Sequence, residues 1–505
     1  MKLTRRHFLG AAGAGLASVY GRLDGLPLVH AEETVIKPER VRFTDDIEPL
    51  VQLIENTPRT EAVEVLAREI KGGLGYTPFL SALFLAGIRN VNPQPPGFKL
   101  HCVFMIHSAN YLAQMAPPEE RMLPLFFALD EVKRSQREDL RTGDFVLPPA
   151  GTVLPKPTAA WEAFRSSMDA WDSAGADLAI TSLIRHEKPA QVFEGLWEYG
   201  ARDYRNLGHK MIFVAHAWRT LQSIGWQHAE PTLRSLILAL LDYGQSTVFS
   251  GYAYEDQAYH YNRRQAERRH EDLPEDWTNH SPNEGLTLEL LSILRKGEAE
   301  AATDFAMDAL SDGRCDSGAI WDAVHLAGGE MMMRQPAVTA VHAVTSVNSL
   351  HYGFRTTTSD KTRLLLLLQG LGWMTQFRHF LDESRDKEVR ITSLREGKLP
   401  KSESRAVESI LDSVSEDRNK AASKAFAYGK KFSDPAQYFD VARQLVFRKS
   451  VEHHQLKWPA ALFEDYYQVS PQWRPHMLAT SAYYLRGSGH RNSTVVERAV
   501  KILAG

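Results

Sequence analysis

Nineteen histidines are spread along the 505 residues, and a few of them stand directly after apolar runs. His107 follows the run Cys102–Ile106, and His342 follows Ala337–Val341. Burying an imidazole costs free energy unless the ring is hydrogen-bonded or bound to a metal ion. His107 and His342 are therefore candidate metal ligands. The alternative for each of them is a buried imidazole bonded to a backbone carbonyl.

Two further histidines, His209 and His216, flank the apolar run Met211–Ala215. In a helix, residues seven apart share one face but lie about 10 Å apart along the axis. That separation is awkward for two ligands of a single ion. We expect one of the pair at a metal ion, and the other in a supporting position or facing a substrate.

A lysine accompanies the last candidate histidine. His454 and Lys457 are three residues apart and so adjacent on one helical face. A protonated lysine opposes metal binding. A neutral amine does not, and carbon dioxide converts a neutral amine into a carbamate, which is an anionic oxygen ligand. Burial favours the neutral amine that this reaction requires.

Helical periodicity predicts the elements that position these side chains. Apolar residues recur at spacings of three and four, for example Leu286, Leu290 and Leu294, and alternating strand-like runs are nearly absent. Proline-rich and polar stretches such as Asn92–Gly97 and residues 270–285 indicate loops. We predict an all-α protein in which residues 32–505 form one large helical body with long ordered loops.

Composition excludes several classes of function. Lys and Arg number 59 against 62 Asp and Glu, a net charge of -3, so there is no basic excess for binding nucleic acid. The two cysteines exclude a disulfide scaffold. A metal ion in this chain must therefore be held by nitrogen and oxygen ligands.

The N-terminal sequence indicates a targeting signal rather than part of the folded domain. Paired arginines in Thr4–Leu9 precede a weakly apolar, glycine-rich stretch, and Val29 and Ala31 provide small residues for cleavage. This pattern indicates a twin-arginine export signal over residues 1–31, and hence a periplasmic or secreted protein. The stretch is shorter than the roughly 20 residues of a membrane-spanning helix, and no later segment is predicted to span a membrane.

The order of four short motifs resembles the questin oxidase-like family of helical proteins. The motifs are the early His107, the segment Gly208–Arg219 with His209 and His216, the segment His342–Thr345, and the late segment His454–Lys457. Together they extend over roughly residues 100 to 470.

This resemblance implies a mononuclear non-haem iron oxygenase. The implied Fe(II) ligands are His107, His209, His342, His454 and a carboxylated Lys457. The implied reaction is oxidative carbon–carbon cleavage of an aromatic or polyketide-like small molecule with dioxygen. Under this hypothesis His216 acts as an acid or base for a substrate hydroxyl, because the ordinary pKa of histidine lies near neutrality.

Two alternative functions are compatible with the same histidines. The same histidines suit a zinc or copper enzyme, because imidazole binds several metal ions. The other alternative is an exported binding or structural protein without catalysis, in which the histidines are core residues. In that case Met331–Met333 with His325 suggest copper handling, although methionines on a helix commonly fill gaps in a core.

Overall fold

The computed structural model describes residues 39–242, 254–381 and 387–504, and residues Arg40–Gly505 form one compact unit. All regular elements in the described ranges are α-helices or short 3-10 helices, which confirms the predicted all-α class. The predicted export signal lies outside the described residues. Within the described part, no helix combines the length and the apolar character needed to cross a bilayer.

The first half of the unit, within the described residues, contains eleven α-helices. They are α2 (Glu48–Asn56), α3 (Arg59–Lys71), α4 (Tyr76–Asn90), α5 (His101–Gln114), α6 (Leu123–Thr142), α7 (Pro157–Asp169), α8 (Ser173–His186), α9 (Pro189–Glu194), α10 (Trp197–Ala201), α11 (His209–Ile224) and α12 (Ala229–Leu240). The 3-10 helices η2 (Phe98–Leu100) and η3 (Arg205–Gly208) lead into α5 and α11.

The second half continues in the same way, with helices of similar length. They are α14 (Tyr254–Arg269), α15 (Glu284–Lys296), α16 (Ala299–Ser311), α17 (Ser317–Arg334), α18 (Val338–Thr356), α19 (Asp360–His379), α20 (Glu403–Glu416), α21 (Arg418–Lys431), α22 (Ala436–Lys449), α23 (His454–Gln468), α24 (Arg474–Thr480) and α25 (Thr494–Ala504). The final helix packs on α3 and α6, where Arg498 pairs with Glu64.

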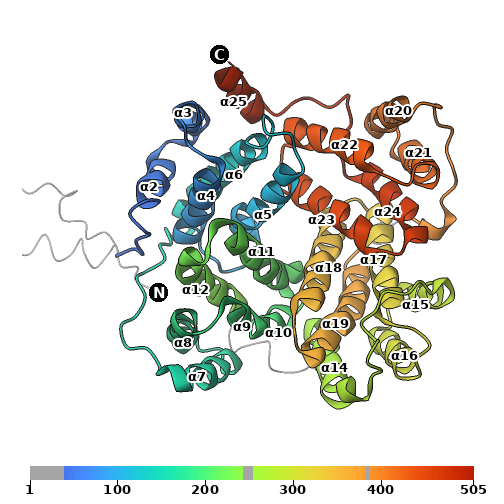
Figure 1. Cartoon of the computed structure of the whole chain (residues 1–505), viewed down its shortest axis with the longest axis horizontal. Coiled ribbons are helices and arrows are strands. Elements are labelled where there is room, and N and C mark those ends of the chain that lie inside the picture. The colour runs from blue at the N-terminus through green and yellow to red at the C-terminus, as the bar shows by residue number, and fades with distance from the viewer. Residues whose placement is uncertain (1–38, 243–253, 382–386, 505) are drawn as a thin grey trace, which may run out of the picture. The chain divides into compact units, whose positions relative to one another are not determined.

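Four helices from distant parts of the sequence form the centre of the unit. α5 packs on α11, α11 on α18, α18 on α23, and α23 on α5, so the four close a ring (Figure 1). Most residues of α5 and α18 are buried. A helix that is apolar around most of its circumference belongs in a core, whereas α3 buries only one stripe, Ala62 to Ala67.

A left-handed turn sets where α11 begins. Asn206 and Leu207 both have φ 56°, and Gly208 has φ 76°. A Cβ atom on Gly208 would lie 2.8 Å from Cβ of Ser346 and 2.9 Å from the ring of Trp373. Glycine therefore permits both the backbone conformation and the close approach of α11 to α18 and α19. The next residue, His209, is fixed in position by this turn.

The predicted loop at Asn92–Gly97 is irregular in the structure and lies before η2. The predicted loop at 270–285 contains a single short 3-10 turn, His270–Asp272, and ends where α15 begins at Glu284.

Candidate metal centre

Four histidines, one from each helix of the central ring, meet at one end of that ring. His101, His209 and His454 are the first residues of α5, α11 and α23, and His342 lies near the start of α18. The Nε2 atoms are 3.0 Å apart for His101 and His454, 3.3 Å for His101 and His209, and 2.9 Å for His209 and His342. The N-terminal ends of the four helices therefore converge on one cluster of imidazole nitrogens.

The opposite nitrogen of three of these rings is bonded to an acceptor. Nδ1 of His342 lies 2.8 Å from the carbonyl of Val338, and Nδ1 of His454 lies 2.8 Å from Oε2 of Glu452. Nδ1 of His209 contacts the carbonyl of Asn206. Carbonyl and carboxylate oxygens only accept hydrogen bonds, so Nδ1 carries the proton in each ring. In each of these three neutral rings, Nε2 is then unprotonated and carries a lone pair.

With this assignment, the 2.9 Å contact between Nε2 of His209 and Nε2 of His342 is not a hydrogen bond, because neither nitrogen carries a proton. Two lone pairs at that distance repel each other unless a cation lies between them. Metal–nitrogen bonds of about 2.1 Å place neighbouring ligand atoms about 3.0 to 3.4 Å apart for bond angles between 90° and tetrahedral. The Nε2 separations of 3.3 Å between His101 and His209 and of 2.9 Å between His209 and His342 fall close to this range, and the ligand atoms of these three residues lie within 4.8 Å of one another. This triad therefore fits a metal ion. His101, His453 and His454 form a second such group, so His454 lies beside the first triad rather than within it.

Burial keeps these imidazoles neutral. It lowers the pKa of His101, His209 and His342 well below the ordinary value, and the nearby Lys457 acts in the same direction. Burial likewise lowers the pKa of His454, to about 4. Neutral imidazole is the form that binds metal ions, so the four rings are ready as ligands at neutral pH.

Lys457 lies one turn into α23, beneath the histidines, and is fully buried. Its Nζ has no hydrogen-bond partner and lies 5.4 Å from the centre of the Phe104 ring. Burial lowers the pKa of the Lys457 amine to about 7. A substantial fraction is therefore neutral at neutral pH, as carbamate formation requires. The converging helix N-termini favour the negative charge that a carbamate adds.

A fifth histidine, His453, stands at the edge of the cluster. Its ring centre is 4.1 Å from that of His101, in an edge-to-face arrangement. Nδ1 of His453 lies 3.1 Å from Oε2 of Glu131 and 3.0 Å from Nη2 of Arg134. The Glu131 carboxylate thus orients this ring.

An apolar cavity of about 310 Å³ opens onto the cluster. The imidazoles of His101, His209, His342, His453 and His454 form one part of its wall. The rest comes from Pro96, Gly97, Phe98, Asn206, Leu207 and Val338. The cavity lies within the size range of small-molecule sites in proteins, and its apolar wall suits an aromatic or aliphatic ligand.

Two residues shape the entrance of this cavity. Phe98, with φ 37°, is 77% exposed although it is a large apolar side chain. Gly97 has φ 117°, and a Cβ atom there would lie 3.2 Å from the ring of His209. Glycine therefore allows the backbone to pass close to the histidine, and Phe98 leaves an apolar surface at the opening.

The structure corrects the expected position of His107. This residue lies six positions after His101 on α5, a rise of about 9 Å, and it is not in the cluster. Its Nε2 accepts a hydrogen bond of 3.0 Å from Arg219, whose positive charge opposes a second cation. His101, rather than His107, meets His209 and His454, and His209 in turn meets His342. Lys457 lies near enough to lower the pKa of these rings, but its Nζ forms no hydrogen bond with any of them.

The structure also separates His209 from His216, as the spacing predicted, but it does not support the acid–base role of His216. The His216 ring lies 4.7 Å from that of His107 and does not border the apolar cavity. Its Nδ1 donates to the carbonyl of Phe104 over 2.8 Å. Burial and the neighbouring Arg219 hold the pKa of His216 well below its usual range.

The structure gives His325 and Met331–Met333, the residues suggested for copper handling, other contacts. His325 instead bonds to His351 over 2.8 Å, and the His351 ring stacks on Trp321. Met331–Met333 are buried core residues of α17. These side chains therefore belong to the packing of the helices.

Sequence reasoning missed His101 and His453, although signals for both were present. His101 stands directly before the apolar run Cys102–Ile106, which His107 follows. His209 likewise stands before the apolar run Met211–Ala215. His453 is the neighbour of His454. The clustered histidines lie within the first turn or so of their helices, whereas His107 and His216 lie near the middle of α5 and α11.

The chain matches no protein-family model, and comparisons with curated proteins and with solved structures likewise give no match.

Proposed function

We propose that this protein is a metal-dependent oxygenase whose ion is held by the triad His101, His209 and His342, with His454 beside it. The observation that carries the proposal is the separation of 2.9 Å between the unprotonated Nε2 atoms of His209 and His342, with Nε2 of His101 3.3 Å from that of His209, beside an apolar cavity. Lone pairs brought together in this way need a cation to offset their repulsion.

Fe(II) is the ion that we propose. Imidazole accepts iron, zinc, copper and nickel, but a set of several histidines with one anionic oxygen suits the ligand preference of ferrous iron. Lys457, converted to a carbamate, is the proposed source of that oxygen. Bound Fe(II) would supply the site at which dioxygen is activated.

The protein's own residues have separate roles in this proposal. Asn206, Val338 and Glu452 orient the histidines by accepting their Nδ1 protons in hydrogen bonds. The apolar wall of Pro96, Phe98 and the neighbouring side chains excludes water and receives the substrate ring. His453, which borders the cavity and is tied to Glu131, is placed to hold or release a proton at the substrate.

The proposed substrate is an aromatic or polyketide-like small molecule, and the proposed reaction is oxidative carbon–carbon cleavage by dioxygen. The cavity is nearly without polar lining apart from the imidazoles, which favours a planar apolar molecule carrying a few hydroxyl groups. Export to the periplasm or outside the cell through residues 1–31 is part of the same proposal.

The test is dioxygen uptake by protein loaded anaerobically with Fe(II), measured with a panel of polyhydroxylated anthraquinones. We expect uptake that depends on a panel compound, with mass spectrometry showing oxygen atoms gained by the product. His342→Ala should abolish it, and His270→Gln, a change at a histidine that is neither in the cluster nor in the cavity wall, should not. Uptake restored by zinc or copper rather than iron, or no compound-dependent uptake at all, would contradict the proposal.

A further inference from the structure

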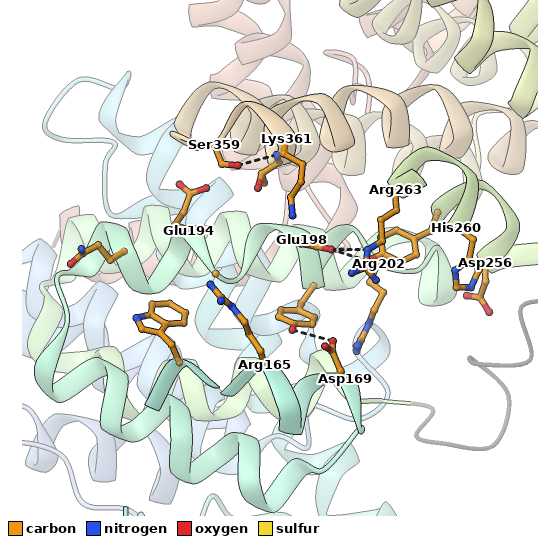
Figure 2. Close-up of a pocket in the computed structure, with 16 residues that line it drawn as sticks. Arg165, Asp169, Glu194, Glu198, Arg202, Asp256, His260, Arg263, Ser359 and Lys361 are labelled. Carbon is orange, nitrogen blue, oxygen red and sulfur yellow. Dashed lines mark hydrogen bonds and ion pairs between the residues drawn. The ribbon is translucent and has the colours of Figure 1, made fainter. Parts of the chain in front are cut away.

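A second and larger cavity, of about 750 Å³, lies away from the histidine cluster and shares no lining residue with the first cavity. Its walls come from α7, from the segment α9–α10, from α14 and from the start of α19 (Figure 2). In contrast to the apolar cavity, it is lined largely by charged and aromatic side chains.

The carboxylates of this cavity already have partners. Each of the four acidic lining residues accepts hydrogen bonds from neighbouring side chains. The pairs are Asp169 with Tyr199, Glu194 with Thr357 and Thr358, Glu198 with Tyr259 and Arg263, and Asp256 with Arg205. The acidic groups are therefore engaged in holding the walls together.

Two of the cationic groups lack such partners. Arg165 on α7 and Lys361 on α19 extend into the cavity from opposite walls (Figure 2). Within the described residues neither forms an ion pair, and the only contact of the Arg165 guanidinium is with the Trp161 ring, 5.7 Å from its centre. Both positive charges are available to a ligand.

A third cation, Arg202, lies deeper in the same cavity and is only 6% exposed. Its Nη1 donates to the carbonyl of Met168 over 2.9 Å, its guanidinium lies 3.9 Å from the centre of the Trp171 ring, and its Nε has no partner. In the described part of the chain no carboxylate forms an ion pair with it. Burial lowers the pKa of Arg202, although the carboxylates of Asp203 and Asp169 act in the opposite direction. An anionic ligand would favour the charged guanidinium further.

The backbone adds partial positive charge beside Lys361. Lys361 and Thr362 lie in the first turn of α19, a 20-residue helix capped by the Ser359 side chain. The N-terminal end of a helix carries partial positive charge and favours anions. This end of α19 borders the cavity beside Lys361.

Aromatic rings complete the walls. A Cβ atom on Gly195 would lie 2.5 Å from the Trp161 ring, so the glycine allows this ring to pack closely against the α9–α10 segment. Tyr199 lines the same cavity. Such rings provide flat apolar contact for the carbon skeleton of a ligand, while cations at either side bind its acidic groups.

We propose that this cavity binds a small organic molecule with two or more acidic groups, either carboxylates or phosphates. One acidic group pairs with Arg165 and another with Lys361 and the start of α19. Arg202 supplies positive potential from beneath. The proposal is independent of the metal centre, because the two sites share no residue.

The test is isothermal titration calorimetry of the full chain at low salt with citrate and with fructose 1,6-bisphosphate. These two probes distinguish carboxylate from phosphate recognition, and glucose and putrescine serve as the neutral and the cationic probe. We expect at least one anion to bind, and binding to weaken with added salt. Arg165→Gln and Lys361→Gln should each weaken it at least tenfold.

Neither variant removes a hydrogen bond, so both should fold normally by circular dichroism. Arg141→Gln, on the exposed side of α6, is the matched control and should bind as the unchanged protein does. Equal affinity in the double variant Arg165→Gln, Lys361→Gln would overturn the proposal. So would the absence of anion binding at millimolar concentration, or stronger binding of glucose or putrescine.

Discussion

At the scale of single residues, the candidate metal centre depends on which nitrogen of each imidazole carries the proton. Val338, Glu452 and Asn206 accept from Nδ1 and thereby direct the lone pairs of Nε2 toward one another. His107 and His216 are also buried on α5 and α11, but they bond outside the cluster. Nε2 of His107 accepts from Arg219, and Nδ1 of His216 donates to the carbonyl of Phe104. Hydrogen bonds around a ring, more than the presence of the ring, separate candidate ligands from core histidines.

The first prediction concerns Glu452, which orients His454 without belonging to the nitrogen cluster. Although burial alone raises the pKa of Glu452, hydrogen bonding with His454 lowers it to about 2, so the carboxylate is ionised. Glu452→Ala should lower metal affinity by roughly 10- to 100-fold while leaving the ligands in place. Competition with a chromophoric chelator measures this change. The exposed Glu61→Ala should leave affinity unaltered, and an equal affinity in both variants would contradict the role of Glu452.

The second prediction concerns pH. The folded-state pKa of His454 is lowered to about 4, so the unfolded chain binds more protons between about pH 4 and 6.5. The stability contributed by the neutral ring is fully present above pH 6.5 and is lost as pH falls toward 4. For His454 alone the loss between pH 7 and pH 5 is about 2 kcal/mol.

Urea unfolding of the metal-free protein at the two pH values measures this loss, and His454→Phe provides the control. The pH dependence should be smaller in that variant. An identical dependence in both proteins would show that His454 is not the neutral, buried group described here.

Part of the candidate site could be predicted from residue types and their neighbours in the sequence. His209, His342, His454 and Lys457 stood beside apolar runs, and burial of those runs brings them together. The choice between His101 and His107 depended on which end of α5 meets the other three helices. Both flank the same apolar run, so composition and periodicity do not distinguish them.

At the scale of elements, the decisive feature is that α5, α11, α18 and α23 begin at the same end of their ring. Three of them start with the clustered histidine itself. Helical periodicity predicted that such helices exist. It carries no information about which helix ends converge, because that arrangement is set by packing between segments hundreds of residues apart.

The third prediction tests the left-handed turn that starts α11. Gly208→Ala should destabilise the protein by about 1 to 3 kcal/mol, because φ is 76° and the added Cβ would press on Ser346 and Trp373. Metal affinity should fall as well, since His209 follows directly. Thermal unfolding and chelator competition measure the two effects.

The matched control for this change is Gly297→Ala at the end of α15. Gly297 also has positive φ, 80°, but nothing lies within 4 Å of its ideal Cβ position. It should cost about 1 kcal/mol and leave metal affinity unchanged. Equal losses of metal affinity in the two variants would contradict a specific link between Gly208 and the site.

At the scale of the whole molecule, the candidate centre joins parts of the chain from His101 to Lys457. The central ring therefore requires most of the compact unit to be folded before the four nitrogens meet. Because the site is assembled from distant parts of one helical body, metal binding at the site and the global stability of the fold are coupled. An ion bound only by the folded state stabilises the fold by mass action.

The fourth prediction follows from this coupling. Metal-loaded protein with free Fe(II) at 100 times the dissociation constant should be more stable than metal-free protein by about 2.7 kcal/mol. Anaerobic calorimetry with and without iron measures the shift in unfolding temperature. His342→Ala should show no shift, whereas His270→Gln should show the full one. A shift of equal size in both would locate the bound iron outside the cluster.

The most direct test of the central claim is the metal content of the protein purified without chelators, measured by inductively coupled plasma mass spectrometry. We predict close to one iron per chain in the unchanged protein and almost none in His209→Ala or His342→Ala. Less than a tenth of an equivalent of any transition metal after growth with iron, or the same content in all three proteins, would contradict a metal centre at His101, His209 and His342.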